Sequence, residues 1–337
     1  MKRNIFAVCD VETEYVVNLT EYLNRKKNLP FEIQAFTSVE SLKKYAAETF
    51  IELLLISGRA MCREVKELNI GKVIILSEEG RLPEMESYPC VYKYQSTAQV
   101  LREVMGCYSQ ERGAAPLSFP IRTKAVELIG VYSPIRRCLK TSFALVLGQI
   151  LARDKGVLYI NMEEYSGFDE LTGESSGKNM SDLLYYVRQR DGAVTLRLNS
   201  IIRTVNNLDY IPPVKTPWDI REVPWADWEW FLSELCKSSG YELIILDVGT
   251  EVDEIFRLLD LCGRIYMPVL SYRVSRAKLA QFEDLVRLWD YPGILEKTVK
   301  VTPPLHLDTT EGKGYIQRLP WTELGDYVRK LLRNRNP

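Results

Sequence analysis

The sequence predicts an α/β protein built from two doubly wound parallel-sheet domains, and three observations support that prediction. Short apolar runs of strand length alternate with segments whose apolar residues recur at helical spacing. Strands that are apolar on both faces are typical of a parallel sheet that helices cover on both sides. The chain has 337 residues, which suits two domains of ordinary size.

The composition is that of an ordinary globular protein and argues against several classes. There are 44 Lys and Arg residues against 45 Asp and Glu residues, so the charge gives no strong nucleic-acid signal. No apolar stretch approaches the ~20 residues of a membrane span. Seven cysteines without a CxxC pair favour reduced thiols in the cytoplasm over disulfides or zinc. The single histidine, His306, is expected in a loop or at a strand end.

The first domain, residues 1–108, is predicted to contain five strand–helix units. The expected strands are Ile5–Cys9, Phe31–Phe36, Leu53–Ile56, Val73–Leu76 and Val91–Lys93. Helices are expected around Tyr15–Leu23, over Val39–Ala47 and over Ala98–Met105. Ser38 is expected to cap the second of these helices. Five such units in about this length indicate a flavodoxin-like domain.

Four polar residues are expected at the ends of strands in this domain. Asp10 ends the first strand, Ser57 the third, Ser77 the fourth and Lys93 the fifth. The pattern resembles a response-regulator receiver domain, with Ser57 in place of the phospho-accepting aspartate. A serine alcohol cannot take phosphate as a carboxylate does and brings no charge for magnesium. The resemblance therefore implies a pseudo-receiver for docking or dimerisation, the alternative for Ser57 being a purely structural hydroxyl.

Residues 109–123 are predicted to link this domain to a second one, which spans residues 124–337. The linker has no apolar periodicity and contains turn-forming glycine and proline. The second domain again shows apolar strands, and its first strand is followed by a loop and a helix. The expected strands are Val126–Tyr132, Val157–Asn161, Leu243–Asp247 and Arg264–Pro268, and the expected helix is Phe143–Leu151.

A strand, a loop, a Lys-Thr pair and a helix follow one another here, which is the layout of a phosphate-binding loop. The start of a helix offers unpaired amides and a positive dipole end to phosphate. Lys140 would reach the β- and γ-phosphates, and the hydroxyl of Thr141 would bind magnesium. The glycines of the pattern are missing, because Pro134 and Leu139 stand in their places. An ordinary helix start is the alternative interpretation.

The order of these segments, including Asp247-Val-Gly249 at the end of an apolar strand, resembles the MinD/ParA family of P-loop ATPases over roughly residues 125–335. The resemblance implies ATP with Mg²⁺ and assigns a role to several residues. The implied nucleotide ligands are Lys140, Thr141, Ser142, Arg136, Arg137 and Asp247, with Thr141 and Asp247 at the metal. Glu163 falls at the catalytic, water-orienting position.

Three departures from the family pattern point to slow hydrolysis. The family's additional lysine falls on Ile135, and Arg136 or Arg137 could replace its charge, although a planar guanidinium is not equivalent to an ammonium. Leu139 replaces a glycine, and Asn161 replaces the aspartate upstream of Glu163. ATP binding with weak or no hydrolysis is the resulting expectation.

A pseudo-receiver followed by a MinD-like domain resembles the TadZ/CpaE proteins, which help to localise the Tad-type pilus secretion machinery of bacteria. The resemblance implies an ATP-binding, dimer-forming localisation or scaffold factor. Its partners would be a second copy of the chain and components of the pilus or secretion machinery. Its location would be cytoplasmic, with recruitment to the cell pole or the inner membrane face.

Two other functions stay open at this point. One is a nucleotide-free interaction protein, which the loop sequence Arg136-Arg137-Cys138-Leu139 favours. The other is a slow MinD/ParA-type ATPase that positions another cell-pole or septum complex, with Glu163 orienting water. The tryptophans between 218 and 230 fit either core packing or a partner surface. The basic segment 327–334 fits either a packed final helix or a peripheral membrane helix.

Overall fold

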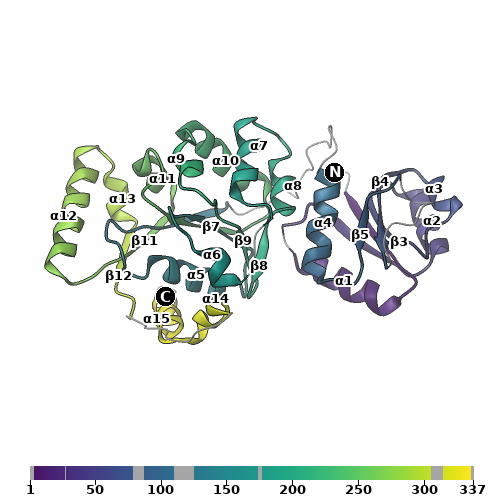
Figure 1. Cartoon of the computed structure of the whole chain (residues 1–337), viewed down its shortest axis with the longest axis horizontal. Coiled ribbons are helices and arrows are strands. Elements are labelled where there is room, and N and C mark those ends of the chain that lie inside the picture. Colours follow the sequence, from purple (N-terminus) through teal and green to yellow (C-terminus); the bar gives the residue numbers. More distant parts are fainter. Residues whose placement is uncertain are drawn as a thin grey trace. The chain divides into compact units, whose positions relative to one another are not determined.

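The chain divides into two units, which we call unit 1 and unit 2 (Figure 1). The computed structural model describes residues 4–26, 28–78, 87–109, 125–173, 177–304 and 314–334. Of these, unit 1 holds the residues up to 109 together with 191–201 and 238–240, and unit 2 holds the remainder. No helix in the described ranges is long and apolar enough to cross a membrane. His306 and all but the first residue of the expected linker lie outside the described ranges.

Unit 1 contains a five-stranded parallel sheet with the order β2-β1-β3-β4-β5. Its strands are β1 (Ile5–Cys9), β2 (Glu32–Phe36), β3 (Ile51–Ser57), β4 (Ile70–Ser77) and β5 (Cys90–Tyr92). The order in which strands are added reverses between β1 and β3, as in doubly wound sheets. All five predicted strands are present, and Lys93 follows β5 directly rather than ending it.

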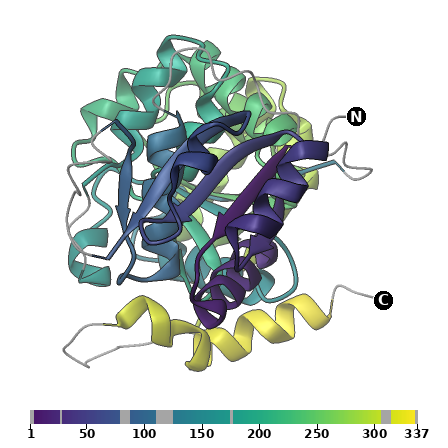
Figure 2. The same ribbon diagram turned by 90° about the vertical axis from the view of Figure 1, so that its right-hand side faces the viewer.

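Helices cover both faces of this sheet, and each face has its own apolar core (Figures 1 and 2). These helices are α1 (Thr13–Arg25), α2 (Val39–Glu48), α3 (Arg63–Lys66) and α4 (Thr97–Ser109). A further short helix of this unit, α8 (Val194–Asn199), packs on α4. Phe6 and Val8 of β1 pack with α1 and α4, whereas Ile5 and Ala7 pack on the opposite face. This alternation follows from the two-residue period of a strand. Ser38 caps α2 through the backbone N–H of Ser41, as predicted.

Unit 2 contains a seven-stranded sheet with the order β12-β11-β6-β10-β7-β9-β8. Its strands are β6 (Glu127–Val131), β7 (Val157–Met162), β8 (Arg203–Val205), β9 (Leu208–Ile211), β10 (Leu243–Val248), β11 (Arg264–Pro268) and β12 (Thr298–Val301). All neighbouring strands are parallel except β8 and β9. The carboxyl ends of β6, β7 and β10 therefore meet at one edge of the sheet, where open α/β sheets bind ligands.

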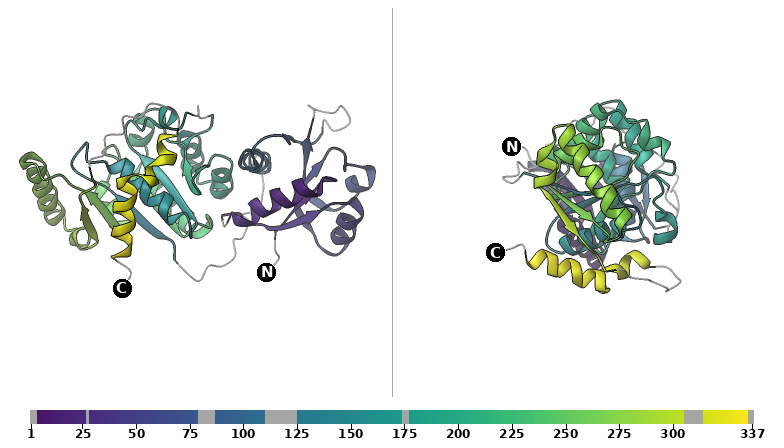
Figure 3. Two further views of the ribbon diagram at one scale, coloured as in Figure 1. Left: turned by 90° about the horizontal axis from the view of Figure 1, so that it is seen from below. Right: turned by 90° about the vertical axis from the view of Figure 1, so that its left-hand side faces the viewer.

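Two layers of helices enclose this sheet (Figures 1 and 3). On one face lie α5 (Lys140–Leu151), α14 (Tyr315–Arg318) and α15 (Glu323–Arg333). The other face is covered by α7 (Met180–Arg188), α10 (Trp225–Ser238) and α11 (Ile255–Leu261). The remaining elements are α6 (Phe168–Thr172), α9 (Trp218–Arg221), α12 (Arg273–Leu288), α13 (Pro292–Glu296) and a 3₁₀ turn at Leu319–Trp321.

The structure answers two packing questions that the sequence left open. The last helix, α15, packs on α5, and its residues Val328, Leu331 and Leu332 join the core of unit 2. Its apolar side chains are therefore turned into the fold instead of being available to a membrane. Trp228 is fully buried, whereas Trp218 is 59% exposed, so core packing explains only the first of these tryptophans.

Candidate phosphate-binding site

The loop between β6 and α5 takes a left-handed backbone at two residues that are not glycine. Arg137 and Leu139 both have φ of 60°, a conformation that costs an L-residue about 1–3 kcal/mol. Of these two positions, that of Leu139 holds glycine in the phosphate-loop pattern to which the sequence was compared. The loop thus keeps the backbone conformation that glycine would favour, in spite of the two Cβ atoms.

Contacts to the end of β11 hold the loop in this shape. The hydroxyl of Ser133 donates to the Pro268 carbonyl at 2.7 Å and accepts from the Ile135 N–H at 3.2 Å. The thiol of Cys138 donates to the Ile135 carbonyl at 3.1 Å. Burial raises the pKa of Cys138, so the thiol keeps its proton and remains a donor. These anchors offset the backbone strain at Arg137 and Leu139.

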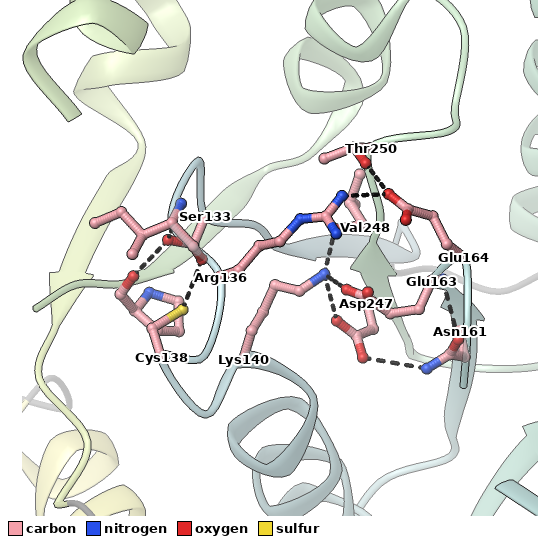
Figure 4. A network of polar contacts seen from close by, with 12 residues as sticks. Ser133, Arg136, Cys138, Lys140, Asn161, Glu163, Glu164, Asp247, Val248 and Thr250 are labelled. Atoms are coloured by element: carbon pink, nitrogen blue, oxygen red, sulfur yellow. Dashed lines mark hydrogen bonds and ion pairs between the residues drawn. The ribbon is translucent and has the colours of Figure 1, made fainter. Parts of the chain in front are cut away.

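A cavity of about 370 Å³ lies beside the loop (Figure 4). Its wall is formed by the loop and the start of α5, by residues 163–165 after β7, and by residues 248–250 after β10. The cations on this wall are Arg136, Arg137 and Lys140, and the hydroxyl-bearing residues Thr141 and Ser142 line it from the first turn of α5. Cations, hydroxyls and a helix start are the groups that bind phosphate in proteins.

Lys140 stands at the centre of the site, and three oxygen groups surround its ammonium (Figure 4). It forms ion pairs with Glu163 and, at 3.1 Å, with Asp247, and it donates to the Val248 carbonyl. Burial lowers the pKa of Lys140, but the negative charges of Asp247 and Glu163 outweigh that effect and raise the pKa above its usual value. Lys140 is therefore charged at neutral pH.

Asp247 is held rigidly behind Lys140, away from the cavity wall. Its side chain is fully buried, and one carboxylate oxygen accepts from the Tyr159 hydroxyl at 2.8 Å and from the Asn161 amide at 3.3 Å. Asn161 also donates to the Tyr159 oxygen at 2.9 Å. Burial, with the nearby Asp247 charge, raises the pKa of Tyr159 well above its usual value, so the hydroxyl stays a donor.

The two neighbouring glutamates have different partners. Glu163 lies in the loop after β7, where its backbone N–H donates to the Asn161 side chain at 3.0 Å and its carboxylate faces Lys140. Burial raises the pKa of Glu163 more than Lys140 lowers it. Glu164 instead pairs with the exposed Arg136 at 2.9 Å and accepts from the Thr250 hydroxyl.

Gly249 brings the loops after β7 and β10 into backbone contact. A Cβ at this position would lie 2.2 Å from the Met162 carbonyl oxygen and 3.0 Å from the Glu163 Cα. Because Cβ atoms do not approach backbone this closely, the two loops can only meet at a glycine. Gly249 therefore places Glu163 next to the Val248 carbonyl and Lys140.

The structure thus gathers the residues that the sequence singled out, with two qualifications. Lys140, Thr141, Ser142, Arg136, Arg137 and Glu163 line one cavity, whereas Asp247 lies behind it. The hydroxyl of Ser142 lies 3.3 Å from that of Tyr315 on α14. Sequence reasoning missed Tyr159, Thr250 and the close approach at Gly249. A signal for Tyr159 existed, because it lies two residues before Asn161 and so points to the same face of β7.

The strand ends of unit 1 carry a second group of charges. Lys93 is fully buried and lies 2.8 Å from Asp10, 3.0 Å from Glu12 and 3.3 Å from Glu78. Burial lowers the pKa of Lys93, but the hydrogen bonds to Asp10 and Glu12 outweigh it and raise the pKa. The hydroxyl of Ser57 is buried and has no hydrogen-bond partner among the described residues.

Fold and site define an α/β protein with parallel sheets and a strand–loop–helix turn over a cationic cavity. No protein-family model and no curated protein matches the chain. It is similar to a ParA family ATPase from Chlorobium tepidum, with 16% identity and a TM-score of 0.46, over 62% of this chain and 94% of that one.

Two further solved structures show a comparable similarity. Apo McdA from Cyanothece has 13% identity and a TM-score of 0.44, over 61% of this chain and 99% of that one. Cobyrinic acid a,c-diamide synthase from Mycobacterium smegmatis, solved with an ATP analog and magnesium, has 12% identity and a TM-score of 0.42, over 62% and 95%. These similarities are too distant to assign a function to this chain.

Proposed function

We propose that unit 2 binds ATP with Mg²⁺ through the loop 133–139 and the start of α5. The observation that carries this proposal is the loop conformation: Arg137 and Leu139 have a left-handed backbone, and Leu139 stands where the phosphate-loop pattern has glycine. Strained backbone that the surrounding structure maintains is characteristic of ligand sites. The loop in this conformation and Lys140 line the same cavity.

The residues at the cavity fit a polyphosphate and its metal ion. Lys140 and the guanidinium groups of Arg136 and Arg137 supply positive charge, and the first turn of α5 supplies backbone amides. Thr141 would hold Mg²⁺, with Asp247 behind it. Among the described residues no three His, Cys, Asp or Glu side chains form a metal site, so the nucleotide phosphates would supply the remaining oxygens. The metal ion would neutralise phosphate charge.

We further propose that hydrolysis is slow or absent, so that nucleotide serves as a signal for assembly. Asn161 stands where the family pattern has an aspartate, and its side chain is engaged by Tyr159, Asp247 and the Glu163 N–H. An amide cannot act as a general base, so Asn161 cannot assist Glu163 in activating water. A slow MinD/ParA-type ATPase that positions another cell-pole or septum complex is the alternative if Glu163 alone orients water once nucleotide is bound.

Unit 1 is proposed to act as a receiver-like docking or dimerisation module that is not phosphorylated. The strand order 2-1-3-4-5 is that of flavodoxin-like domains. Ser57 offers no carboxylate, and Lys93 is already neutralised by three carboxylates. A pseudo-receiver in unit 1 together with a nucleotide site in unit 2 supports a TadZ/CpaE-like localisation factor that dimerises and binds pilus or secretion components. Cytoplasmic location and recruitment to the cell pole or inner membrane face belong to the same proposal.

Calorimetric titration of Mg²⁺-ATP into the full chain tests the nucleotide proposal. We expect binding to the wild type and a loss of about 100-fold or more in Lys140→Ala, because a charged hydrogen bond to phosphate is removed and two carboxylates are left facing it. Lys155→Ala is the matched control, since Lys155 is exposed in the same unit, and its affinity should be unchanged. A wild type that does not bind would favour the nucleotide-free interaction protein.

Incubation with a radiolabelled small-molecule phosphodonor tests the assignment of unit 1. We expect no label on the full chain, because a serine alcohol at position 57 is a poor phosphoryl acceptor and is fully buried. Ser57→Asp, which introduces a carboxylate at this position, is the variant with which the labelling of the wild type is compared. Label on the wild type that disappears in Ser57→Ala would contradict the pseudo-receiver interpretation.

A further inference from the structure

The most confined charge in the cavity is already neutralised by the chain itself. A lysine ammonium has three N–H groups, and three oxygen groups surround that of Lys140: Glu163, Asp247 and the Val248 carbonyl. A phosphate oxygen can therefore reach Lys140 only by displacing one of them. We propose that Glu163 is a built-in competitor of phosphate, which occupies Lys140 without nucleotide and leaves when nucleotide binds. This inference rests on the proposed function.

Glu163 is the partner of Lys140 that is able to leave. The Val248 carbonyl belongs to β10, and Asp247 is fully buried and held by Tyr159 and Asn161. The Glu163 side chain is 27% exposed and extends from a loop. In the part of the chain that the structure describes, its carboxylate pairs with Lys140 alone, whereas its backbone N–H donates to Asn161, so the carboxylate can rotate away while the loop stays in place. Asp247 then keeps the ammonium charged and oriented.

The Lys140–Glu163 pair is confined enough to compete with a ligand. The Lys140 side chain is 12% exposed, so water screens this pair less than it would at the surface. The neighbouring pair of Arg136 with Glu164 differs, because the Arg136 side chain is 76% exposed and such pairs contribute little. Glu163 thus pairs with a confined cation, Lys140, whereas Glu164 of the same cavity pairs with a solvated one, Arg136 (Figure 4).

Glu163→Gln tests this competition, because it removes the charge and keeps the shape. In the full chain we expect Mg²⁺-ATP to bind about tenfold more tightly than to the wild type, as one charged hydrogen bond no longer has to be broken. Without nucleotide, the melting temperature should fall, because Lys140 has lost a partner. A gain in affinity together with a loss of stability is expected of a competitor and not of a residue that binds nucleotide.

Glu164→Gln is the matched control, with the same change of charge in the same cavity. We expect it to alter ATP affinity by less than about twofold, since the partners that it releases are the solvated guanidinium of Arg136 and the neutral hydroxyl of Thr250. An equal gain in both variants would overturn the proposal in favour of a general charge effect. Unchanged or weaker binding to Glu163→Gln, with a wild type that binds, would overturn it too. Folded wild type and Glu163→Gln that both fail to bind would instead refute the proposed function, and this inference with it.

Discussion

Lys93→Met is expected to lower the free energy of unfolding of unit 1 by about 3–5 kcal/mol, because it leaves the buried carboxylate of Asp10 without its cation. The wild-type ammonium is fully buried and within 3.3 Å of Asp10, Glu12 and Glu78. Asp10 is itself fully buried, so no water can replace the ammonium at its side. Methionine keeps the packing volume and removes only the charge and its hydrogen bonds.

Urea denaturation of the full chain separates this effect from any change in unit 2. All six tryptophans of the sequence lie between residues 218 and 321, in unit 2. Circular dichroism should therefore show an earlier transition in the variant, while tryptophan fluorescence stays as in the wild type. Lys43→Met is the control, because Lys43 pairs with Glu64 at an exposed site, and its effect on stability should be far smaller than that of Lys93→Met. Equal stability of the two variants would refute the role of the charge group.

The direction of the pH dependence follows from the raised pKa of Lys93. A lysine whose pKa is higher in the folded state stabilises fully below its unfolded value of about 10.4, so the wild-type contribution is constant between pH 5 and 8. The contribution is lost only as the pH rises above that unfolded value, where the unfolded lysine gives up its proton before the folded one does. The difference in unfolding free energy between variant and wild type should therefore stay constant from pH 5 to pH 8 and shrink above a pH of about 10.4.

The strands were predictable from the sequence because burial on both faces of a parallel sheet leaves a continuous apolar run. Their ends were less predictable, since hydrogen bonding to neighbours extends a strand beyond its apolar residues. β3 runs over Ile51–Ser57 instead of Leu53–Ile56, because Ile51 and Ser57 pair with Ile70 and Leu76 of β4. The start of α5 was predictable for the opposite reason, because the Lys-Thr pair and the helix it opens are local features.

The shape of the loop between β6 and α5 could not be predicted, because it lacks the glycines that would indicate a left-handed backbone. Glycine would indicate a left-handed backbone, but Leu139 adopts one through the contact of Ser133 with Pro268, 135 positions along the chain. The hydrogen bond from the Tyr159 hydroxyl to Asp247 could not be predicted from the sequence either. It depends on the register of β10 against β7, which places Asp247 opposite Asn161.

Gly249→Ala is expected to lower the free energy of unfolding of unit 2 by about 2–4 kcal/mol and to weaken Mg²⁺-ATP binding. The new methyl group would meet the Met162 carbonyl at 2.2 Å. Backbone on both sides of the contact cannot move as a flexible side chain would, so the loops after β7 and β10 must separate. Separation would carry the Val248 carbonyl away from Lys140 and deform the cavity wall that residues 248–250 form.

Gly177→Ala is the matched control for this substitution, since nothing lies within 4 Å of a Cβ at position 177 in the same unit. Its stability should equal or slightly exceed that of the wild type, because alanine restricts the unfolded chain. Urea denaturation followed by tryptophan fluorescence measures both variants in unit 2. If Gly249→Ala were as stable as Gly177→Ala and bound nucleotide like the wild type, the backbone contact would not be what brings Glu163 and Lys140 together.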